Sequence, residues 1–189
     1  KPVLVNANAV GYYPLESKSP IDEGGPQGSS FLAHICGEWQ REAERAGQFG
    51  ARVIVARFAP VLGPGGGVIK SMLPVFSKGL GGRIGNGKQA FPWIHIQDLI
   101  RALEFAASQA HLSGPVNMCA PEQITNAAFT QAMARILKRP ALLPVPAPVL
   151  KLVYGELAQM LLKGAPVVPR ALEQAGFEFS FPTIRAALE

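Results

Sequence analysis

Several side chains that can do chemistry gather after the first apolar run of the chain. Asn8, Tyr12 and Tyr13 follow that run, and Cys36 lies further along, in a helix-like segment. A phenol can transfer a proton, and a thiolate can act as a nucleophile. Ligands bind open α/β sheets at the carboxyl ends of the strands, which favours a cleft beside Tyr12 or Tyr13. Packing in the core is the alternative for both tyrosines and for Cys36.

A second group of candidates lies in the segment WIHIQD, residues 93–98. His95 can titrate near neutral pH and precedes Asp98 by three residues. The alternative for this pair is a structural contact that anchors the loop before a helix. Trp93 can stack on a base or a sugar, or it can fill the core of the protein.

Two glycine clusters, Gly63–Gly67 and Gly79–Gly87, invite a phosphate-binding interpretation. The second cluster precedes Lys88, but Gln89 follows where a Walker motif needs serine or threonine. Neither cluster has the G-x-G-x-x-G spacing of a dinucleotide loop between a strand and a helix. Both are therefore interpreted as loops that border a ligand cleft. Within the second loop region, Asn86, Lys88 and Gln89 are candidates for contacting a substrate.

The elements that must position these residues alternate between strand and helix. Pro2–Val5 and Arg52–Arg57 have the apolar character of buried parallel strands, and the segment Phe31–Gly47 between them has helical periodicity. The same alternation continues to a short strand at Pro115–Met118. Thr125 is a suitable first cap for the helix that follows. Strand, helix and strand in this order predict an α/β fold with a parallel sheet.

The composition changes at Pro140, after which four prolines within nine residues enforce an extended connector. We therefore divide the chain into residues 1–139 and 140–189. Helices are predicted at Val149–Leu162 and Pro169–Ala175. Phe177, Phe179 and Phe181 alternate as they would in a strand.

Composition excludes several classes of protein. The 189 residues are 48% hydrophobic and 16% charged, and the net charge of +5 comes from scattered lysines and arginines rather than from a basic block. We therefore expect no nucleic-acid partner. No apolar run reaches the roughly 20 residues of a spanning helix, so we expect no membrane segment. Two isolated cysteines predict reduced thiols rather than a disulfide or a metal site. No signal peptide is visible, so we expect a cytoplasmic location. The oligomeric state is left open.

Three segments together resemble a known family. Asn6–Tyr13 (NANAVGYY), Arg57–Gly67 (RFAPVLGPGGG) and Gly79–Asp98 (GLGGRIGNGKQAFPWIHIQD) occur in the order and spacing of NAD(P)-dependent nucleoside-diphosphate-sugar epimerase-like proteins, an atypical branch of the extended short-chain dehydrogenases/reductases. The tail, residues 139–188, is similar to the C-terminal domain of unknown function of that branch. Within this resemblance, residues 1–139 are the C-terminal part of the NAD(P)-binding domain and residues 140–189 are the small C-terminal domain.

The resemblance implies the later half of a Rossmann-type doubly wound parallel sheet, followed by a small α/β domain on the substrate side. Family members begin with a strand and a GxxGxxG loop that holds the cofactor pyrophosphate, and that half is absent from this sequence. We therefore expect the chain to be part of a longer protein. NADP or NAD would bind mainly to the absent half, so that residues 1–189 alone would not bind it detectably.

The resemblance also assigns roles to residues. Asn8, Tyr12 and the segment Arg57, Phe58, Ala59, Pro60 and Val61 are placed beside the cofactor. Asn86, Lys88, Gln89, Trp93 and His95 are placed beside a small-molecule substrate.

The family's acid and base are missing from this chain. The superfamily uses a tyrosine and, four residues later, a lysine that lowers the pKa of the phenol. Leu32 and Cys36 occupy these positions, and Asn8 stands at the usual serine. Tyr12, Asn8 and Cys36 remain as catalytic candidates. The resemblance thus implies an NAD(P)-dependent epimerase or oxidoreductase for a nucleotide-sugar or other small substrate. The alternative is a cofactor-binding, non-catalytic regulator, as in similar proteins described as cell-division inhibitors.

Overall fold

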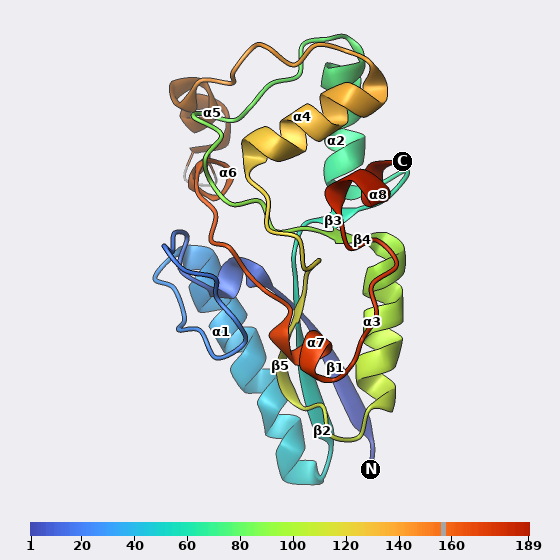
Figure 1. The fold of residues 1–189 in the computed structure, drawn as a ribbon. Helices are drawn as coiled ribbons and strands as arrows, with labels where there is room; N and C mark the ends of the chain where they lie inside the picture. The colour runs from blue at the N-terminus through green and yellow to red at the C-terminus, as the bar shows by residue number, and fades with distance from the viewer. Residues whose placement is uncertain (156–157) are drawn as a thin grey trace.

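The computed structural model describes residues 1–155 and 158–189. Its centre is a parallel sheet in the order β1 (Val3–Ala9), β2 (Arg52–Phe58) and β5 (Gly114–Met118), as Figure 1 shows. A second parallel pair, β3 (Val61–Leu62) and β4 (Ile94–His95), lies beyond the carboxyl end of β2. The predicted α/β fold with a parallel sheet is confirmed.

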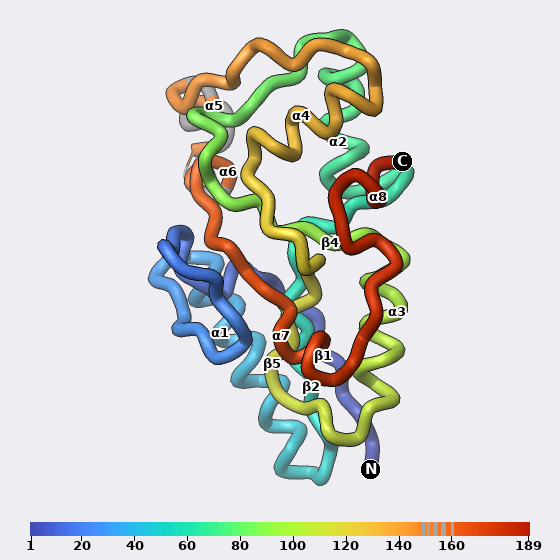
Figure 2. Tube along the Cα trace, viewed as in Figure 1, coloured from blue at the N-terminus to red at the C-terminus, as the bar shows by residue number. Residues whose placement is uncertain are grey.

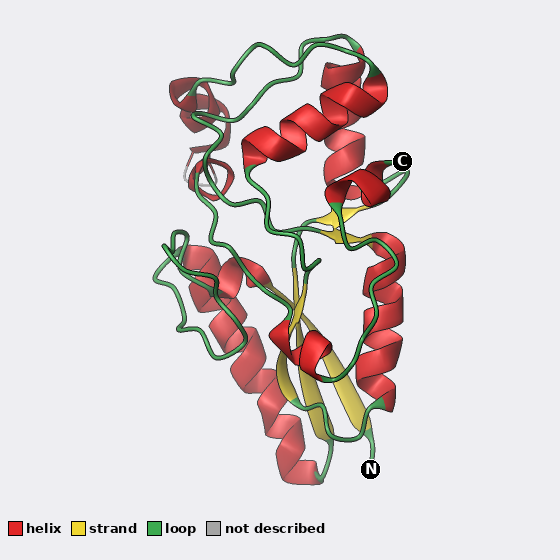
Figure 3. Ribbon diagram, viewed as in Figure 1, coloured by secondary structure: helices red, strands yellow, loops and turns green. Residues whose placement is uncertain are grey.

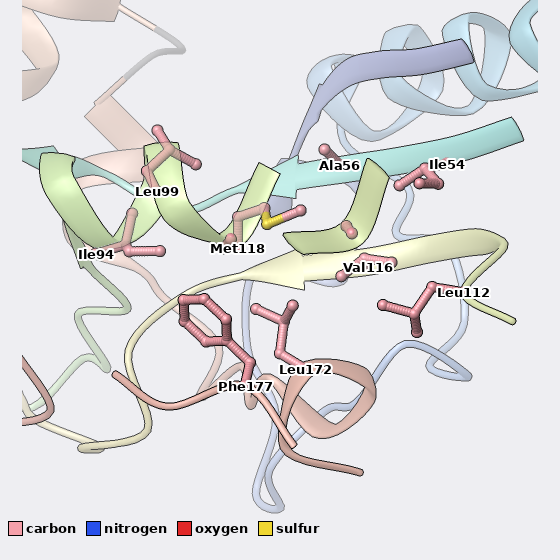
Figure 4. Close-up of a cluster of buried hydrophobic side chains, with 11 residues drawn as sticks. Ile54, Ala56, Ile94, Leu99, Leu112, Val116, Met118, Leu172 and Phe177 are labelled. Atoms are coloured by element: carbon pink, nitrogen blue, oxygen red, sulfur yellow. The ribbon is translucent and has the colours of Figure 1, made fainter. Parts of the chain in front are cut away.

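Helices cover both faces of the sheet (Figure 3). Helix α1 (Phe31–Glu44) packs on one face, and α3 (Ile96–Ser108) with α7 (Arg170–Gln174) packs on the other. Side chains of a strand alternate between faces, so Ile54 and Ala56 of β2 join α3 and α7 while Val55 and Arg57 face α1. The side chains on the α3 and α7 face form the first hydrophobic core. Figure 4 shows this core, in which Leu99, Leu172 and Phe177 pack with the strand residues.

Local sequence explains where the helices begin. The Ser30 hydroxyl accepts a hydrogen bond from the N–H of Ala33 at the start of α1, and Thr125 caps α4 (Asn126–Leu137) in the same way, as predicted. Between β1 and α1 lies the short turn η1 (Val10–Tyr12). The helix predicted to reach Gly47 ends at Glu44 and tightens into η2 (Arg45–Phe49), which Gly50 terminates with a φ of 80°.

A second hydrophobic core lies beyond the carboxyl ends of the sheet strands (Figure 1). It joins α2 (Gly67–Ser77), α4 and α8 (Ile184–Leu188) around the buried rings of Trp93 and Phe129. Figure 2 shows how the last fifty residues return over the molecule, with α7 beside β5 and α8 beside α4. The division at residue 140 stays a prediction, since the segments beyond it pack against both cores.

The C-terminal segment differs from its prediction in one element. The predicted helix 149–162 forms α5 (Ala147–Tyr154) and α6 (Ala158–Leu162), and its residues 156 and 157 lie outside the described part. The predicted strand at Phe177–Phe181 is wrong, because these residues form a loop. Their rings pack on one another and on α3, and the Asp98 carboxylate accepts hydrogen bonds from the N–H groups of Ser180 and Phe181. The alternation of Phe177, Phe179 and Phe181 therefore reflects the packing of their rings and not the pairing of a strand.

In the two described stretches, no helix combines the length and the apolar character needed to cross a membrane.

Candidate functional site

An apolar cavity of about 310 Å³ lies at the carboxyl ends of β1 and β2. The strand ends contribute Ala9, Phe58 and Pro60 to its wall. Other lining residues come from helices α1, α2 and α6 and from the segment after α6; they include Leu32, Val68, Met72, Leu161, Ala165 and Val167. This position is the one at which open parallel sheets bind ligands.

Some of the residues predicted to lie beside the cofactor line the cavity, and others are held within the protein. Phe58 and Pro60 line the cavity. Ala59 is buried between them, and its N–H donates to the carbonyl of Met118 at 3.1 Å, while Val61 begins β3. Asn8 is occupied by the backbone, since its Nδ2 donates to the carbonyl of Cys36 at 2.9 Å and its Oδ1 accepts from the N–H of Ala9. The geometry thus leaves Phe58 and Pro60 as the members of this set that face the cavity.

Arg57 is enclosed by protein groups. It is 1% exposed, and its guanidinium donates to the Tyr13 hydroxyl at 2.6 Å and to Gln40 Oε1 at 2.7 Å. The Tyr12 ring lies against the guanidinium, 3.6 Å from its centroid. A cation held in this way orders the loop around it and is not free to pair with a cofactor phosphate.

Tyr13 lines the cavity, but its hydroxyl is bonded to other protein groups. The hydroxyl donates to Asn117 Oδ1 at 2.8 Å and accepts from Arg57, so both of its functions are used inside the protein. Burial raises the pKa of Tyr13, and the Arg57 cation opposes this only in part. The ring is therefore a wall of the cavity and not a source of protons.

Leu32 and Cys36 stand where the resemblance places the family's acid–base pair, an assignment that stays a prediction. Leu32 lines the cavity, and its side chain approaches Gly11 so closely that a Cβ there would collide with it. Cys36 is fully buried, and burial raises the pKa of its thiol. Leu32 thus gives the cavity a hydrocarbon surface, and Cys36 is part of the protein core.

A polar cleft adjoins the apolar cavity. Asn86, Lys88 and Gln89 line it, and Gln89 belongs to both spaces, while their placement beside a substrate stays a prediction. Pocket residues that the sequence analysis missed are Asn126 and the segment 163–167. That segment is carried into place by the bridge between Ile21 and Val167, and no local pattern signals such a distant pairing.

Trp93 and His95 lie outside the cavity. Trp93 is fully buried in the second core. His95 packs on the ring of Phe181 with centroids 3.8 Å apart, and its Nδ1 accepts from the N–H of Gln97 at the start of α3. Asp98, instead of pairing with His95, accepts from the C-terminal loop and from Arg101. Both candidates therefore serve the fold.

Replacing His95 with asparagine is expected to remove a pH-dependent part of the stability. Burial lowers the pKa of His95 from its usual 6.5, so the unfolded chain binds this proton more tightly than the folded protein does. The contribution of neutral His95 is then present above pH 6.5 and is lost as the pH falls through the folded-state pKa. Thermal melts from about pH 8 to about pH 5 should show the native protein losing more stability than His95→Asn. Asparagine keeps the helix cap, and equal slopes would contradict this role.

Comparisons with known proteins agree with this geometry. Residues 3–119 match the model of the NAD dependent epimerase/dehydratase family, and residues 145–189 match a domain of unknown function, DUF1731. The chain is 46% identical over 186 residues to epimerase family protein Mb2239 of Mycobacterium bovis, covering 98% of this chain and 62% of that protein. It is 44% identical over 182 residues to epimerase family protein SDR39U1 of Mus musculus, again covering 62% of that protein.

Solved structures show the same similarity. The crystal structure of human epimerase family protein SDR39U1 with NADPH superposes with a TM-score of 0.91 at 39% identity, over 98% of this chain and 63% of that one. A nucleoside-diphosphate sugar epimerase from Corynebacterium glutamicum gives a TM-score of 0.81 at 28% identity, over 98% of this chain and 36% of that one. The chain thus spans less than two thirds of the length of these relatives. It belongs to the NAD dependent epimerase/dehydratase family.

Proposed function

We propose that the chain forms the substrate side of an NAD(P)(H)-dependent oxidoreductase of the epimerase type, acting on a small molecule. The observation that carries this proposal is the cavity at the carboxyl ends of β1 and β2, with Phe58 and Pro60 in its wall. These are residues that the family resemblance places beside the nicotinamide. The human relative, whose structure contains NADPH, supports the same cofactor.

The strand-end wall suits a nicotinamide ring. Ala9, Phe58 and Pro60 present apolar surface, and Pro60 has no N–H that would need a partner there. The cofactor, when bound, supplies hydride transfer. The chain's own residues would orient the ring and exclude water, while Leu32 closes the side from which a family tyrosine would act. Arg57 does not fit a role at the cofactor phosphates, because its guanidinium is already bonded to Tyr13 and Gln40.

A second candidate is a cofactor-binding regulator without catalysis. The observation that favours it is the side-chain chemistry at the dyad positions, since neither Leu32 nor buried Cys36 can exchange a proton with a substrate. A regulator would bind NAD(P)(H) and would not oxidise it. A cytoplasmic location is part of both proposals, because unpaired, buried Cys36 and Cys119 are typical of reducing compartments.

Ala9→Leu is expected to weaken NADPH binding by about tenfold or more, which corresponds to about 1.4 kcal/mol. The added methyl groups would enter the space at the end of β1 that the nicotinamide ring needs. The measurement is an NADPH fluorescence titration of a polypeptide that joins this chain to the GxxGxxG half that the family resemblance implies. NADH is titrated in parallel, and residues 1–189 alone should bind neither cofactor detectably.

Ala51→Leu is the matched control, because Ala51 precedes β2 at the opposite end of the sheet. Unchanged NADPH affinity in Ala9→Leu would contradict the proposed site. Oxidation of NADPH in the presence of a panel of carbonyl compounds would favour the enzyme. Tight binding with no oxidation of NADPH by any of them would favour the regulator.

A further inference from the structure

We propose that the substrate group that enters the apolar cavity is hydrocarbon-rich and carries a single carbonyl, rather than being a sugar. This inference rests on the proposed function and names the substrate class of the same site. Its basis is that most of the polar side-chain atoms around the cavity are engaged elsewhere. Four of the described lining residues are polar or charged, namely Tyr13, Gln89, Asn126 and Lys163.

Tyr13 and Gln89 have little left to offer a ligand. The Tyr13 hydroxyl both donates to Asn117 and accepts from Arg57. Gln89 donates its Nε2 to the carbonyls of Ile84 at 3.2 Å and Leu161 at 3.0 Å, which uses both of its amide hydrogens. Its Oε1 is buried and has no hydrogen-bond partner among the described residues, so it remains as a single acceptor. Tyr13 cannot satisfy a sugar hydroxyl without giving up a bond that holds the fold, and Gln89 can accept from no more than this one oxygen.

Asn126 and Lys163 limit the ligand further. Asn126 Oδ1 accepts from the N–H of Ile84 at 2.8 Å, which fixes the orientation of the amide and leaves Nδ2 as its available donor. Lys163 pairs with Glu16 through Nζ at 3.1 Å. A donor such as Asn126 Nδ2 matches a carbonyl oxygen. A cluster of hydroxyl groups, which needs several acceptors as well as donors, finds no such set among these side chains.

Leu32, Val68, Met72 and Leu161 are part of the apolar lining of the cavity, so a nicotinamide ring against Ala9 and Phe58 would share the cavity with hydrocarbon side chains. A sugar placed there would lose water from its hydroxyl groups without replacement, whereas an apolar body gains from the same dehydration. The volume of about 310 Å³ suits a small ligand.

The experiment compares two probes, 4-tert-butylcyclohexanone and UDP-glucose, by calorimetric titration of the polypeptide that carries both halves, with and without saturating NADPH. We expect the ketone to bind at least about tenfold more tightly than UDP-glucose. Met72→Trp, which adds bulk to the cavity lining, should weaken ketone binding by about tenfold or more. Leu73→Trp is the matched control, because Leu73 is the next residue of α2, is 41% exposed and does not line the cavity. Leu32→Phe fills the cavity from α1 and serves if Met72→Trp does not fold.

Tighter binding of UDP-glucose than of the ketone would overturn the inference, and so would the absence of ketone binding under both conditions. Ketone binding that persists unchanged in a folded cavity-filling variant would place the ketone elsewhere and would also overturn it. The proposed function is judged separately, by NADPH binding to the same preparation. Failure to bind NADPH would count against that function, while the titration without cofactor would still decide whether the cavity takes the ketone.

Discussion

Arg57→Met should lower the free energy of unfolding by about 2–4 kcal/mol, because it removes charge-assisted hydrogen bonds and a buried cation–π contact. The guanidinium joins Tyr13 and Gln40, and the ring of Tyr12 lies against it. Methionine keeps much of the side-chain volume and leaves the Tyr13 hydroxyl and Gln40 without this donor. At roughly 2–4 °C per kcal/mol, thermal melts should show a clear decrease.

The loss should be concentrated in the loop between β1 and α1. Arg57 also donates to the carbonyl of Glu23 at 3.4 Å, and the Glu23 carboxylate accepts from the N–H groups of Asn117 and Ala171. Hydrogen exchange should therefore accelerate in residues 13–28 more than in α3. Arg57→Lys is the control, since lysine keeps the charge without the planar guanidinium. Its stability should lie between that of the native protein and that of Arg57→Met. A melting temperature unchanged in Arg57→Met would show that this network does not stabilise the fold.

Cys36→Lys, which restores the family's lysine, should destabilise the protein by about 3–5 kcal/mol. Cys36 is fully buried beside β1, where its carbonyl accepts from Asn8, and the Arg57 cation is near enough to act on the Cys36 thiol. An ammonium there would be desolvated beside a like charge. Denaturant unfolding at neutral pH measures the loss. The loss should shrink as the pH rises toward about 10, because the fold favours the neutral amine.

Two controls separate charge from size at this position. Cys36→Met introduces a long side chain without charge, and overpacking of this kind costs about 1–3 kcal/mol. Its loss should not depend on pH. Cys36→Ala, which removes only the thiol, should leave the fold intact. Should Cys36→Lys prove as stable as Cys36→Ala, the position would be open to a catalytic lysine and the absence of the dyad would be a matter of residue type alone.

The sequence predicted most of the elements because their signals are local. Apolar runs such as Arg52–Arg57 and the periodic helix from Phe31 need only neighbouring residues to be recognised. The placement of Leu32 and Cys36 at the dyad positions comes from the family resemblance and stays a prediction. The alternation at Phe177–Phe181 led to the wrong prediction of a strand, because aromatic rings that pack on α3 can have the same spacing as the residues of a strand.

By itself, the sequence determined the α/β class, the family and the strand ends at which a ligand site should lie. Only the tertiary structure decided which polar groups at that site are free. Arg57 and Asn8 look available in the sequence, yet their partners come from Gln40, Tyr13 and Cys36 on other elements. The segment 163–167 enters the wall through a pairing with Ile21. Hydrogen bonds and burial depend on residues far apart in the chain, so the step from a residue's type to its role required the packed molecule.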